Sequence, residues 1–214
     1  MELGALGVPM LGTAPVARSA DARSAGGNQL FGVNTSGGDA YRRLQGSLVF
    51  NLDSENKSAV LVAGVKKANP STSVAANVGA TAARAGRRTL VVGADLRNAQ
   101  LAPHLGLDAA APGLSDVILD GASLAGSILT VDGIENLSVL TAGTHLDRPA
   151  DVLQSEAFAR LLAAVTADYD LVVIEAPPVL KVADAVDIAA LCDGTVVVAD
   201  RRSDARQAIA DSVE

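Results

Sequence analysis

The chain has 214 residues, a formal net charge of -7 and a sequence pI of about 4.8. An acidic surface repels phosphate backbones, so nucleic acid is excluded as an expected partner. Hydrophobic residues make up 49% of the chain but aromatic residues only 2%, which indicates a core of Ala, Val, Leu and Ile, as in a parallel sheet buried on both faces. The single Cys192 excludes an internal disulfide, and no apolar run approaches the roughly 20 residues that span a bilayer.

The first part of the chain differs in composition from the rest. Residues 1–38 are rich in Gly, Ala and Ser and lack a sustained hydrophobic period, so we predict an arm or linker there. Residues 39–50 place Ala40, Leu44 and Leu48 on one helical face, which predicts a helix. We therefore expect one domain, formed by residues 39–214.

Short apolar runs then alternate with amphipathic segments. This alternation predicts βαβ units and an α/β fold, a doubly wound and mainly parallel sheet with helices on both faces. The expected strands are 58–65, 89–92, 137–141, 171–174 and 195–199, and the expected helices are 71–85, 113–119, 155–166, 182–191 and 206–213.

Ligands of such sheets bind beyond the carboxyl ends of the strands. Four segments follow predicted strands and are candidates for a site: 64–73, 93–97, 175–178 and 200–202. In the first of them we expect a turn at Asn69-Pro70 before the helix begins.

Six segments, in order, resemble motifs of one protein family. They are Leu6–Gly12, Asp39–Leu44, Leu61–Asn77, Leu90–Arg97, Pro112–Val117 and Tyr169–Pro178. The last of these reads Y-D-L-V-V-I-E-A-P-P and is similar to a Walker B segment. Taken together, the chain resembles the cytoplasmic domain of the bacterial tyrosine autokinases that control capsule and exopolysaccharide assembly.

The resemblance implies a Rossmann-like P-loop fold, a magnesium–ATP site and a place at the cytoplasmic face of the bacterial inner membrane. It also implies a transmembrane chain-length-determinant protein or segment as partner, with a homo-oligomer or an active kinase paralogue as a further partner. The positions that it assigns are Lys66, Lys67, Ser71, Thr72, Ser73 and Arg97 for nucleotide, Thr72, Asp95 and Glu175 for magnesium, Asp95 and Glu175 for catalysis, and Asp39, Arg42 and Gln45 for oligomerisation.

The chain departs from the family pattern at the positions that the resemblance assigns to phosphate and magnesium binding. Ala68 and Pro70 stand at the loop glycines, and Ser71 stands at the lysine that contacts phosphates. Proline has no N–H to offer a phosphate and its φ is fixed. Gly93 replaces the first acidic residue of the second motif, and Glu175 replaces the Walker B aspartate. These replacements predict weak or absent magnesium–ATP binding.

Each position also has a plainer interpretation. Residues 68–73 are then an ordinary strand–turn–helix connection in which Ser71 or Thr72 caps the helix, and the nucleotide interpretation needs Lys66 or Lys67 to attract phosphate. Asp95 is either a turn carboxylate or a residual metal ligand. Glu175 is either a catalytic acid or a leftover carboxylate paired with Arg97 or Arg201. The face of the first helix that carries Tyr41, Arg42 and Arg43 is either solvated or an interface.

Three functions follow from these alternatives. The first is a pseudokinase-like module of polysaccharide assembly that acts through protein contacts. The second is an atypical tyrosine autokinase or ATPase that uses magnesium–ATP, with Tyr41 as one candidate acceptor. The third is a nucleotide sensor that binds without turnover.

Overall fold

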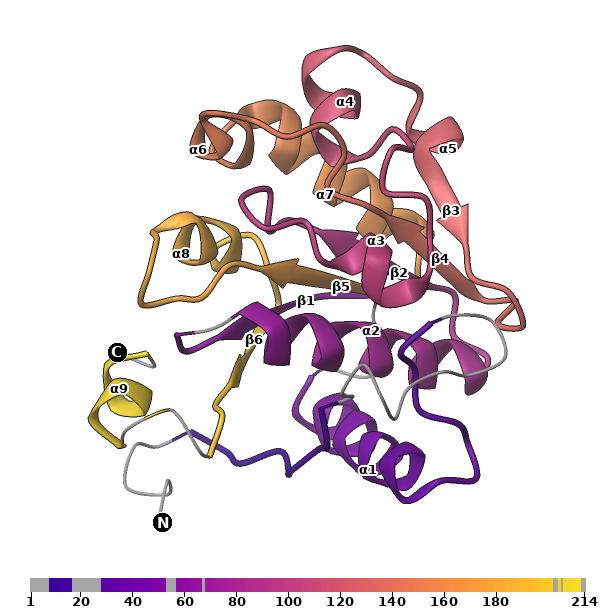
Figure 1. Ribbon diagram of the computed structural model, residues 1–214, viewed down its shortest axis with the longest axis vertical. Coiled ribbons are helices and arrows are strands. Elements are labelled where there is room, and N and C mark those ends of the chain that lie inside the picture. Colours follow the sequence, from indigo (N-terminus) through magenta and orange to yellow (C-terminus); the bar gives the residue numbers. More distant parts are fainter. Residues whose placement is uncertain are drawn as a thin grey trace.

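The computed structural model describes residues 8–16, 28–52, 57–66, 68–201, 204 and 206–212. Its centre is one six-stranded sheet (Figure 1). The strands are β1 (Ser58–Gly64), β2 (Thr89–Gly93), β3 (Ile128–Thr130), β4 (Leu137–Leu140), β5 (Leu171–Ala176) and β6 (Gly194–Val198). They lie in the order β3-β4-β2-β5-β1-β6, and all neighbours are parallel except the antiparallel pair β3 and β4. The predicted α/β class and mainly parallel sheet are confirmed.

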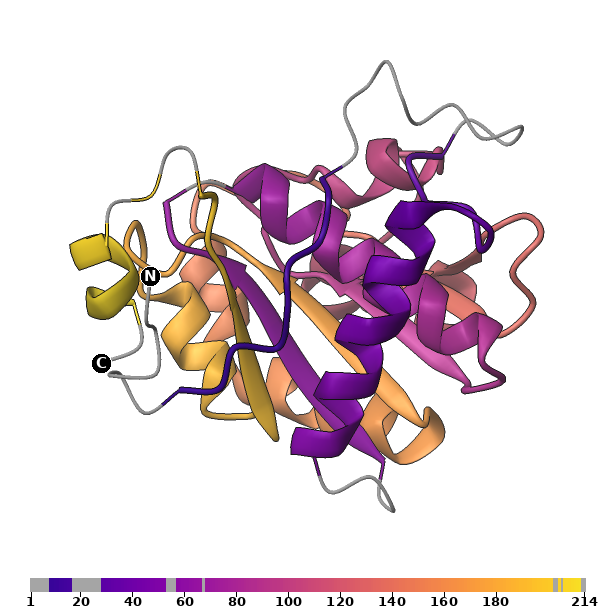
Figure 2. The same ribbon diagram turned by 90° about the horizontal axis from the view of Figure 1, so that it is seen from below.

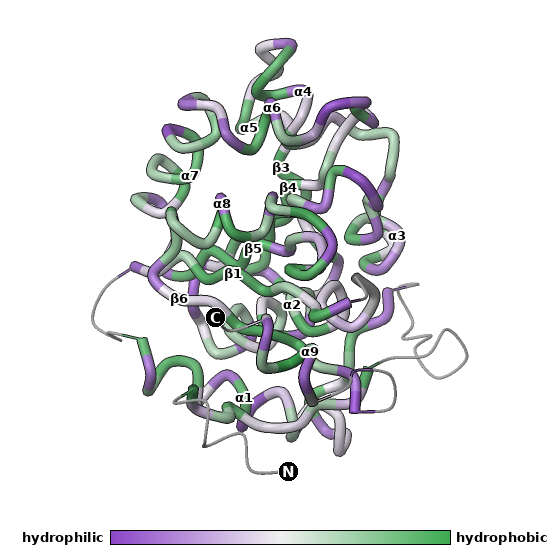
Figure 3. Tube along the Cα trace, turned by 90° about the vertical axis from the view of Figure 1, so that its left-hand side faces the viewer, coloured by the Kyte–Doolittle hydropathy of each residue, from purple (hydrophilic) through white to green (hydrophobic). Residues whose placement is uncertain are grey.

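The central strands are buried along their whole length. Every residue of β1, β2 and β5 is buried, as expected for continuous Val- and Ala-rich runs covered on both faces. Alternate side chains of each strand enter two separate hydrophobic clusters, one on either face of the sheet. Figure 3 shows apolar colour concentrated along β1 and β5 and polar colour in the peripheral connections.

Helices cover both faces, as the doubly wound arrangement requires (Figure 1). One face carries α2 (Ala68–Arg84), with α1 (Ser36–Asn51) outside it and α3 (Leu101–Leu105) beside it. The other face carries α4 (Leu114–Leu119), α6 (Pro149–Leu153), α7 (Glu156–Asp168) and α8 (Asp184–Ala189). The remaining helices are α5 (Leu124–Ser127) and α9 (Arg206–Asp211).

The chain before α1 is packed against the domain where it is described. Leu30 is buried in the cluster between α1 and α2, and Thr35 caps α1, its side-chain oxygen accepting a hydrogen bond from the N–H of Gly38. Residues 8–16 run between α1 and β6 (Figure 2). Leu11 and Ala14 of this segment pack against the same cluster as Leu30.

One prediction about local structure was wrong, and four short elements were missed. α2 begins at Ala68, so Asn69-Pro70 lies in the first turn of the helix, where proline is tolerated because the N–H it lacks has no intrahelical partner. The short elements β3, α3, α5 and α6 were not predicted, because three to five residues do not establish a period. Among the described residues, no helix is both long enough and apolar enough to cross a membrane.

Candidate functional site

The carboxyl ends of the central strands bring three predicted site residues together. The Thr72 hydroxyl, in α2, donates a hydrogen bond of 2.7 Å to Oε1 of Glu175 in β5. The backbone of Asp95, which follows β2, lies next to the Glu175 carboxyl group and acts to lower its pKa, and the backbone N–H of Ala94 donates a hydrogen bond of 2.7 Å to the carbonyl oxygen of Glu175. Gly93 lies beside Glu175 in the parallel register of β2 and β5. The site therefore forms where ligands of such sheets bind.

Burial dominates the electrostatics of Glu175. Its side chain is 1% exposed, and this burial raises the pKa of the carboxyl group to about 8, with the nearby charge of Asp95 acting in the same direction. The hydrogen bond from Thr72 acts against the rise but does not cancel it. The carboxyl group is therefore largely protonated at neutral pH.

Asp95 is a buried turn carboxylate. Its Oδ1 accepts hydrogen bonds from the backbone N–H groups of Arg97 (3.3 Å) and Asn98 (3.0 Å). Burial raises its pKa, and these two bonds oppose the rise. The geometry matches the plainer of the two sequence interpretations, in which Asp95 orders the turn after β2.

Arg97 pairs with a residue that sequence reasoning missed. Its Nε and Nη2 donate to the two carboxylate oxygens of Asp184 at 2.8 and 3.2 Å. Asp184 is 3% exposed and lies in the first turn of α8, where a carboxylate is stabilised by the helix dipole. The predicted pairing of Glu175 with Arg97 is therefore wrong. The sequence did carry a signal for Asp184, because it is an acidic residue at the start of the helix that follows the Walker B-like strand.

The segment expected to form a phosphate loop is helical. α2 starts at Ala68, and Ser71, Thr72 and Ser73 are each at most 1% exposed. The prediction that Ser71 or Thr72 caps the helix is wrong, since both residues lie inside it. The position where the family pattern has its lysine, Ser71, thus faces the interior.

Of the two candidate lysines, only Lys66 lies within the described residues, and it is not part of this cluster. Lys66 is exposed in the connection between β1 and α2, and Lys67 lies outside the described residues. Of the predicted nucleotide-site residues, Thr72 is bonded to Glu175, whereas Arg97 is bonded to Asp184.

Comparisons with known proteins agree with this architecture. The sequence model of the AAA domain family matches residues 60–211. CapB of Staphylococcus aureus, named as a candidate tyrosine-protein kinase, is 32% identical over 164 residues, which cover 76% of this chain and 70% of CapB. This chain belongs to the bacterial tyrosine-kinase family.

Two further comparisons define the extent of the likeness. The tyrosine-protein kinase Wzc of Salmonella typhi is 30% identical over 161 residues, but these cover 75% of this chain and only 22% of Wzc. The kinase domain of the Escherichia coli tyrosine kinase ETK has the same fold, with a TM-score of 0.88 over 99% of this chain and 86% of that domain, at 23% identity. The fold of that domain thus extends over nearly the whole of this chain, whereas the chain spans only 22% of the length of Wzc.

The positions that the family resemblance assigns to oligomerisation lie on α1. Arg42 forms an ion pair with Asp39 one turn earlier and donates a hydrogen bond of 2.6 Å to the carbonyl oxygen of Val33. Gln45 is half-buried on the same helix. Their contacts are internal here, and an intersubunit role stays a prediction.

Tyr41 does not belong to a solvated face of α1. It is 0% exposed, and its hydroxyl donates a hydrogen bond of 2.8 Å to the carbonyl oxygen of Pro15. Burial raises its pKa to about 12, against the effect of the adjacent Ser73 hydroxyl. In this conformation Tyr41 is inaccessible as a phosphate acceptor, so that expectation is wrong.

Proposed function

We propose that this chain is a pseudokinase-like module that acts through protein contacts at the cytoplasmic face of a bacterial polysaccharide-assembly system. Its expected partners are a transmembrane chain-length-determinant protein or segment and an active kinase paralogue. The family resemblance supports a place in a bacterial polysaccharide-assembly system. The chemistry of the site supports the absence of productive magnesium–ATP binding.

The buried bond between Thr72 and Glu175 carries the proposal. Magnesium prefers hard, charged oxygen ligands and octahedral geometry. Thr72 and Glu175 are each 1% exposed and bonded to one another, and the pKa of about 8 leaves Glu175 largely uncharged at neutral pH. The residues present therefore do not fit a magnesium–nucleotide group in this arrangement.

The position of the missing acid supports the same conclusion. A Cβ atom added at Gly93 would lie 3.3 Å from the backbone N of Ala142 and 3.3 Å from Cδ2 of Leu101. Leu101 is 2% exposed. Apolar packing thus occupies the surroundings in which the family pattern has a carboxylate.

An atypical autokinase or ATPase is the second candidate. The observation in its favour is that Thr72, Asp95 and Glu175 do converge at the carboxyl ends of β2 and β5. It would need the first turn of α2 to open and Lys66 or Lys67 to supply the charge that Ser71 lacks. A nucleotide sensor would need the same opening without turnover.

Thermal unfolding with and without millimolar magnesium–ATP or magnesium–ADP tests the proposal. A ligand at 100 times its Kd adds about 2.7 kcal/mol, which corresponds to about 5–10 °C for a chain of this size. We expect no shift with either nucleotide. A magnesium-dependent rise would overturn the proposal, and released phosphate would then distinguish an enzyme from a sensor.

Restoring the family residues provides the positive control. The changes are Pro70→Gly, Ser71→Lys and Gly93→Asp, combined with Leu101→Ala to make room for the new carboxylate. Nucleotide-dependent stabilisation of this variant alone would show that the natural residues disable the site. Equal stabilisation of the unaltered chain would contradict the proposal.

A further inference from the structure

Residues 8–16 form a segment without regular secondary structure that passes between α1 and β6 (Figure 2). Two contacts with α1 define its course. Met10 lines a hollow together with Phe50, near the end of the helix, whereas the carbonyl oxygen of Pro15 lies 2.8 Å from the hydroxyl of Tyr41, nearer its start. The segment therefore runs antiparallel to α1.

Few contacts hold this segment to the domain. Leu11 and Ala14 are half-buried and pack against the hydrophobic cluster that includes the buried face of α1, whereas the other residues from 8 to 16 are exposed. Among the described residues, the hydrogen bond that ties its backbone to the domain is the one from the Tyr41 hydroxyl to Pro15. A segment with so few buried contacts belongs to the part of a fold that opens at low free energy.

Tyr41, which contacts the segment, is far more buried than the segment itself. It is 0% exposed and belongs to the hydrophobic cluster that includes the inner face of α1. Its ring lies 5.6 Å from the ring of Phe31, so the domain holds the aromatic part of the side chain. The hydroxyl is bonded to Pro15 instead, and it is therefore the group whose surroundings change most if the segment leaves.

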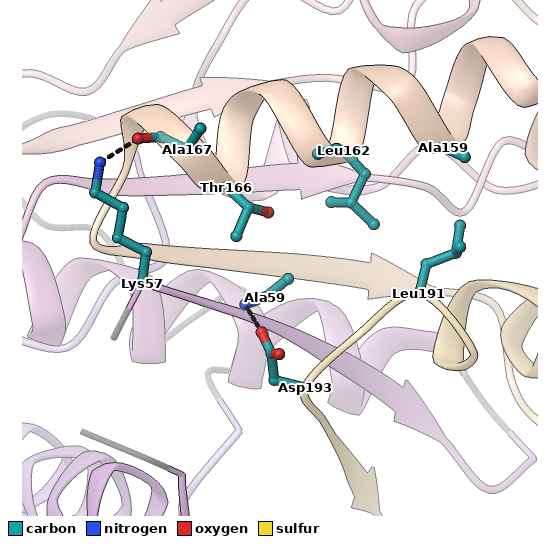
Figure 4. Close-up of a pocket in the computed structure, with 9 residues that line it drawn as sticks. Lys57, Ala59, Ala159, Leu162, Thr166, Ala167, Leu191 and Asp193 are labelled. Atoms are coloured by element: carbon teal, nitrogen blue, oxygen red, sulfur yellow. Dashed lines mark hydrogen bonds between the residues drawn. The ribbon is translucent and has the colours of Figure 1, made fainter. Parts of the chain in front are cut away.

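The fold does not require every groove on its surface to be covered. A groove of about 710 Å³, lined largely by Ala and Leu side chains, lies between α7 and the start of β1 (Figure 4). Its two charged side chains are bonded to backbone groups, Lys57 to the carbonyl oxygen of Ala167 and Asp193 to the N–H of Ala59 at 2.8 Å. The folded chain thus tolerates an uncovered apolar groove, and the departure of residues 8–16 from α1 would create another.

We propose that residues 8–16 are a strap that opens and closes over α1 while the domain stays folded, and that the bond between the Tyr41 hydroxyl and Pro15 is its latch. In the closed state Leu11 and Ala14 hold the inner side of the strap against the domain, and Tyr41 is shielded from solvent and from other proteins. In the open state the Tyr41 hydroxyl becomes accessible.

Under the function proposed above, on which this regulation rests, the arm joins the domain to its membrane partner. A rearrangement of that partner would draw the chain before Val8 away from α1 and open the strap. The domain would then present Tyr41 and its apolar surroundings to a protein partner. The strap itself needs no nucleotide, so its tests are independent of the thermal-unfolding experiment with magnesium–ATP.

Limited proteolysis of the full chain measures the opening. Thermolysin cleaves at apolar residues of detached, extended segments, so cleavage between residues 8 and 16, mapped by mass spectrometry at low protease concentration, reports the open population. Tyr41→Phe removes the latch, and cleavage should become faster by roughly fivefold, the effect of one neutral hydrogen bond. Tyr169→Phe is the matched control and should be cleaved like the natural chain. An unchanged rate in Tyr41→Phe overturns the latch.

Urea below the unfolding transition separates opening of the strap from unfolding of the domain. Local opening exposes little surface, so cleavage between residues 8 and 16 should keep a nearly constant rate in low urea. Global unfolding exposes far more surface, and cleavage that depended on it would accelerate steeply. A rate that rises with the slope of global unfolding overturns the strap.

A charge on the inner side of the strap provides an independent test. Ala14→Asp places a carboxylate against the apolar cluster and should open the strap, whereas Thr13→Asp places the same charge at an exposed neighbour and should leave it closed. N-acetylimidazole acetylates accessible tyrosine hydroxyls, and mass spectrometry locates the product. Acetylation of Tyr41 should be faster in Ala14→Asp than in Thr13→Asp and the natural chain, and equal rates in the two aspartate variants overturn the strap.

Discussion

The Thr72 hydroxyl donates to Glu175 at 2.7 Å across the junction of α2 and β5, and both side chains are 1% exposed. The bond joins a helix whose first turn replaces a phosphate loop to the strand that carries the Walker B-like segment. The family resemblance assigns these two positions to magnesium, whereas here they are hydrogen-bonded to each other. The junction is therefore closed by protein groups.

Replacing Thr72 by Val tests how much this bond stabilises the fold. Valine has a similar shape but no donor, so the buried Glu175 carboxyl group loses a partner, which costs about 1–3 kcal/mol. Denaturant unfolding measures the change in the free energy of unfolding. Thr72→Ser keeps the donor and is the control. Unchanged stability of Thr72→Val would show that the bond does not stabilise the fold, whereas a loss in Thr72→Ser would measure the packing of the methyl group that valine keeps.

Glu175→Gln should change how stability depends on pH. The pKa of Glu175 is raised from 4.5 to about 8 by burial. Between these values the unfolded chain releases this proton while the folded chain keeps it, so the free energy of unfolding falls as pH rises from about 5 to 8. Glutamine keeps an acceptor for Thr72 and removes the titration.

Thermal unfolding of the two proteins between pH 6 and 8 measures the difference. The natural chain should lose stability across this range, and Glu175→Gln should lose clearly less. Asp168→Asn, which removes an exposed carboxylate, should behave like the natural chain. Parallel pH profiles for the natural chain and the glutamine variant would show that Glu175 is already ionised in the fold.

The sequence predicted the sheet because its evidence is local. The five parallel strands are continuous apolar runs, each bounded by turn residues, and the helices between them have clear periods. β3 was missed because it has three residues and partly exposed side chains. The start of α2 was missed because Asn69-Pro70 favours a turn, and the propensity of two residues was overridden by the helix that follows.

The sequence predicted which residues form the candidate site, but not how they are buried, protonated or paired. The motif order identified Thr72, Asp95 and Glu175 as neighbours. Their burial, the protonation of Glu175 and the pairing of Arg97 with Asp184 depend on packing between segments distant in the sequence. The residues of a motif do not by themselves reveal such packing.

Gly93→Asp alone should destabilise the fold. The new Cβ would lie 3.3 Å from both Ala142 N and Leu101 Cδ2, and the carboxylate would join Glu175, which lies beside Gly93 in the sheet. A buried unpaired charge and overpacking each cost about 1–3 kcal/mol or more. Leu101→Ala in the same chain should relieve the steric part, which a double-mutant cycle of unfolding free energies measures. Additive effects would exclude Leu101 as the obstacle.

Two glycines of α1 should respond to alanine in opposite directions. At Gly37 a Cβ would lie 2.1 Å from the Phe31 ring, whereas at Gly46 it would meet nothing within 4 Å. Gly37→Ala must displace Phe31, which should cost more than about 1 kcal/mol. Gly46→Ala should stabilise the helix by roughly 0.5–1 kcal/mol. Denaturant midpoints measure both, and stabilisation at Gly37 would show that Phe31 moves freely.

His104→Leu should improve stability in acid. His104 is 8% exposed and its Nε2 has no partner among the described residues, and burial lowers its pKa from 6.5 to about 4. Between these values the unfolded chain binds a proton that the folded chain does not, so stability is lost as pH falls from about 6.5. Leucine removes both the titration and the unpaired nitrogen. Its unfolding temperature should therefore exceed that of the natural chain by more at pH 5 than at pH 7.5, whereas a constant difference would show that His104 is hydrated or paired in solution.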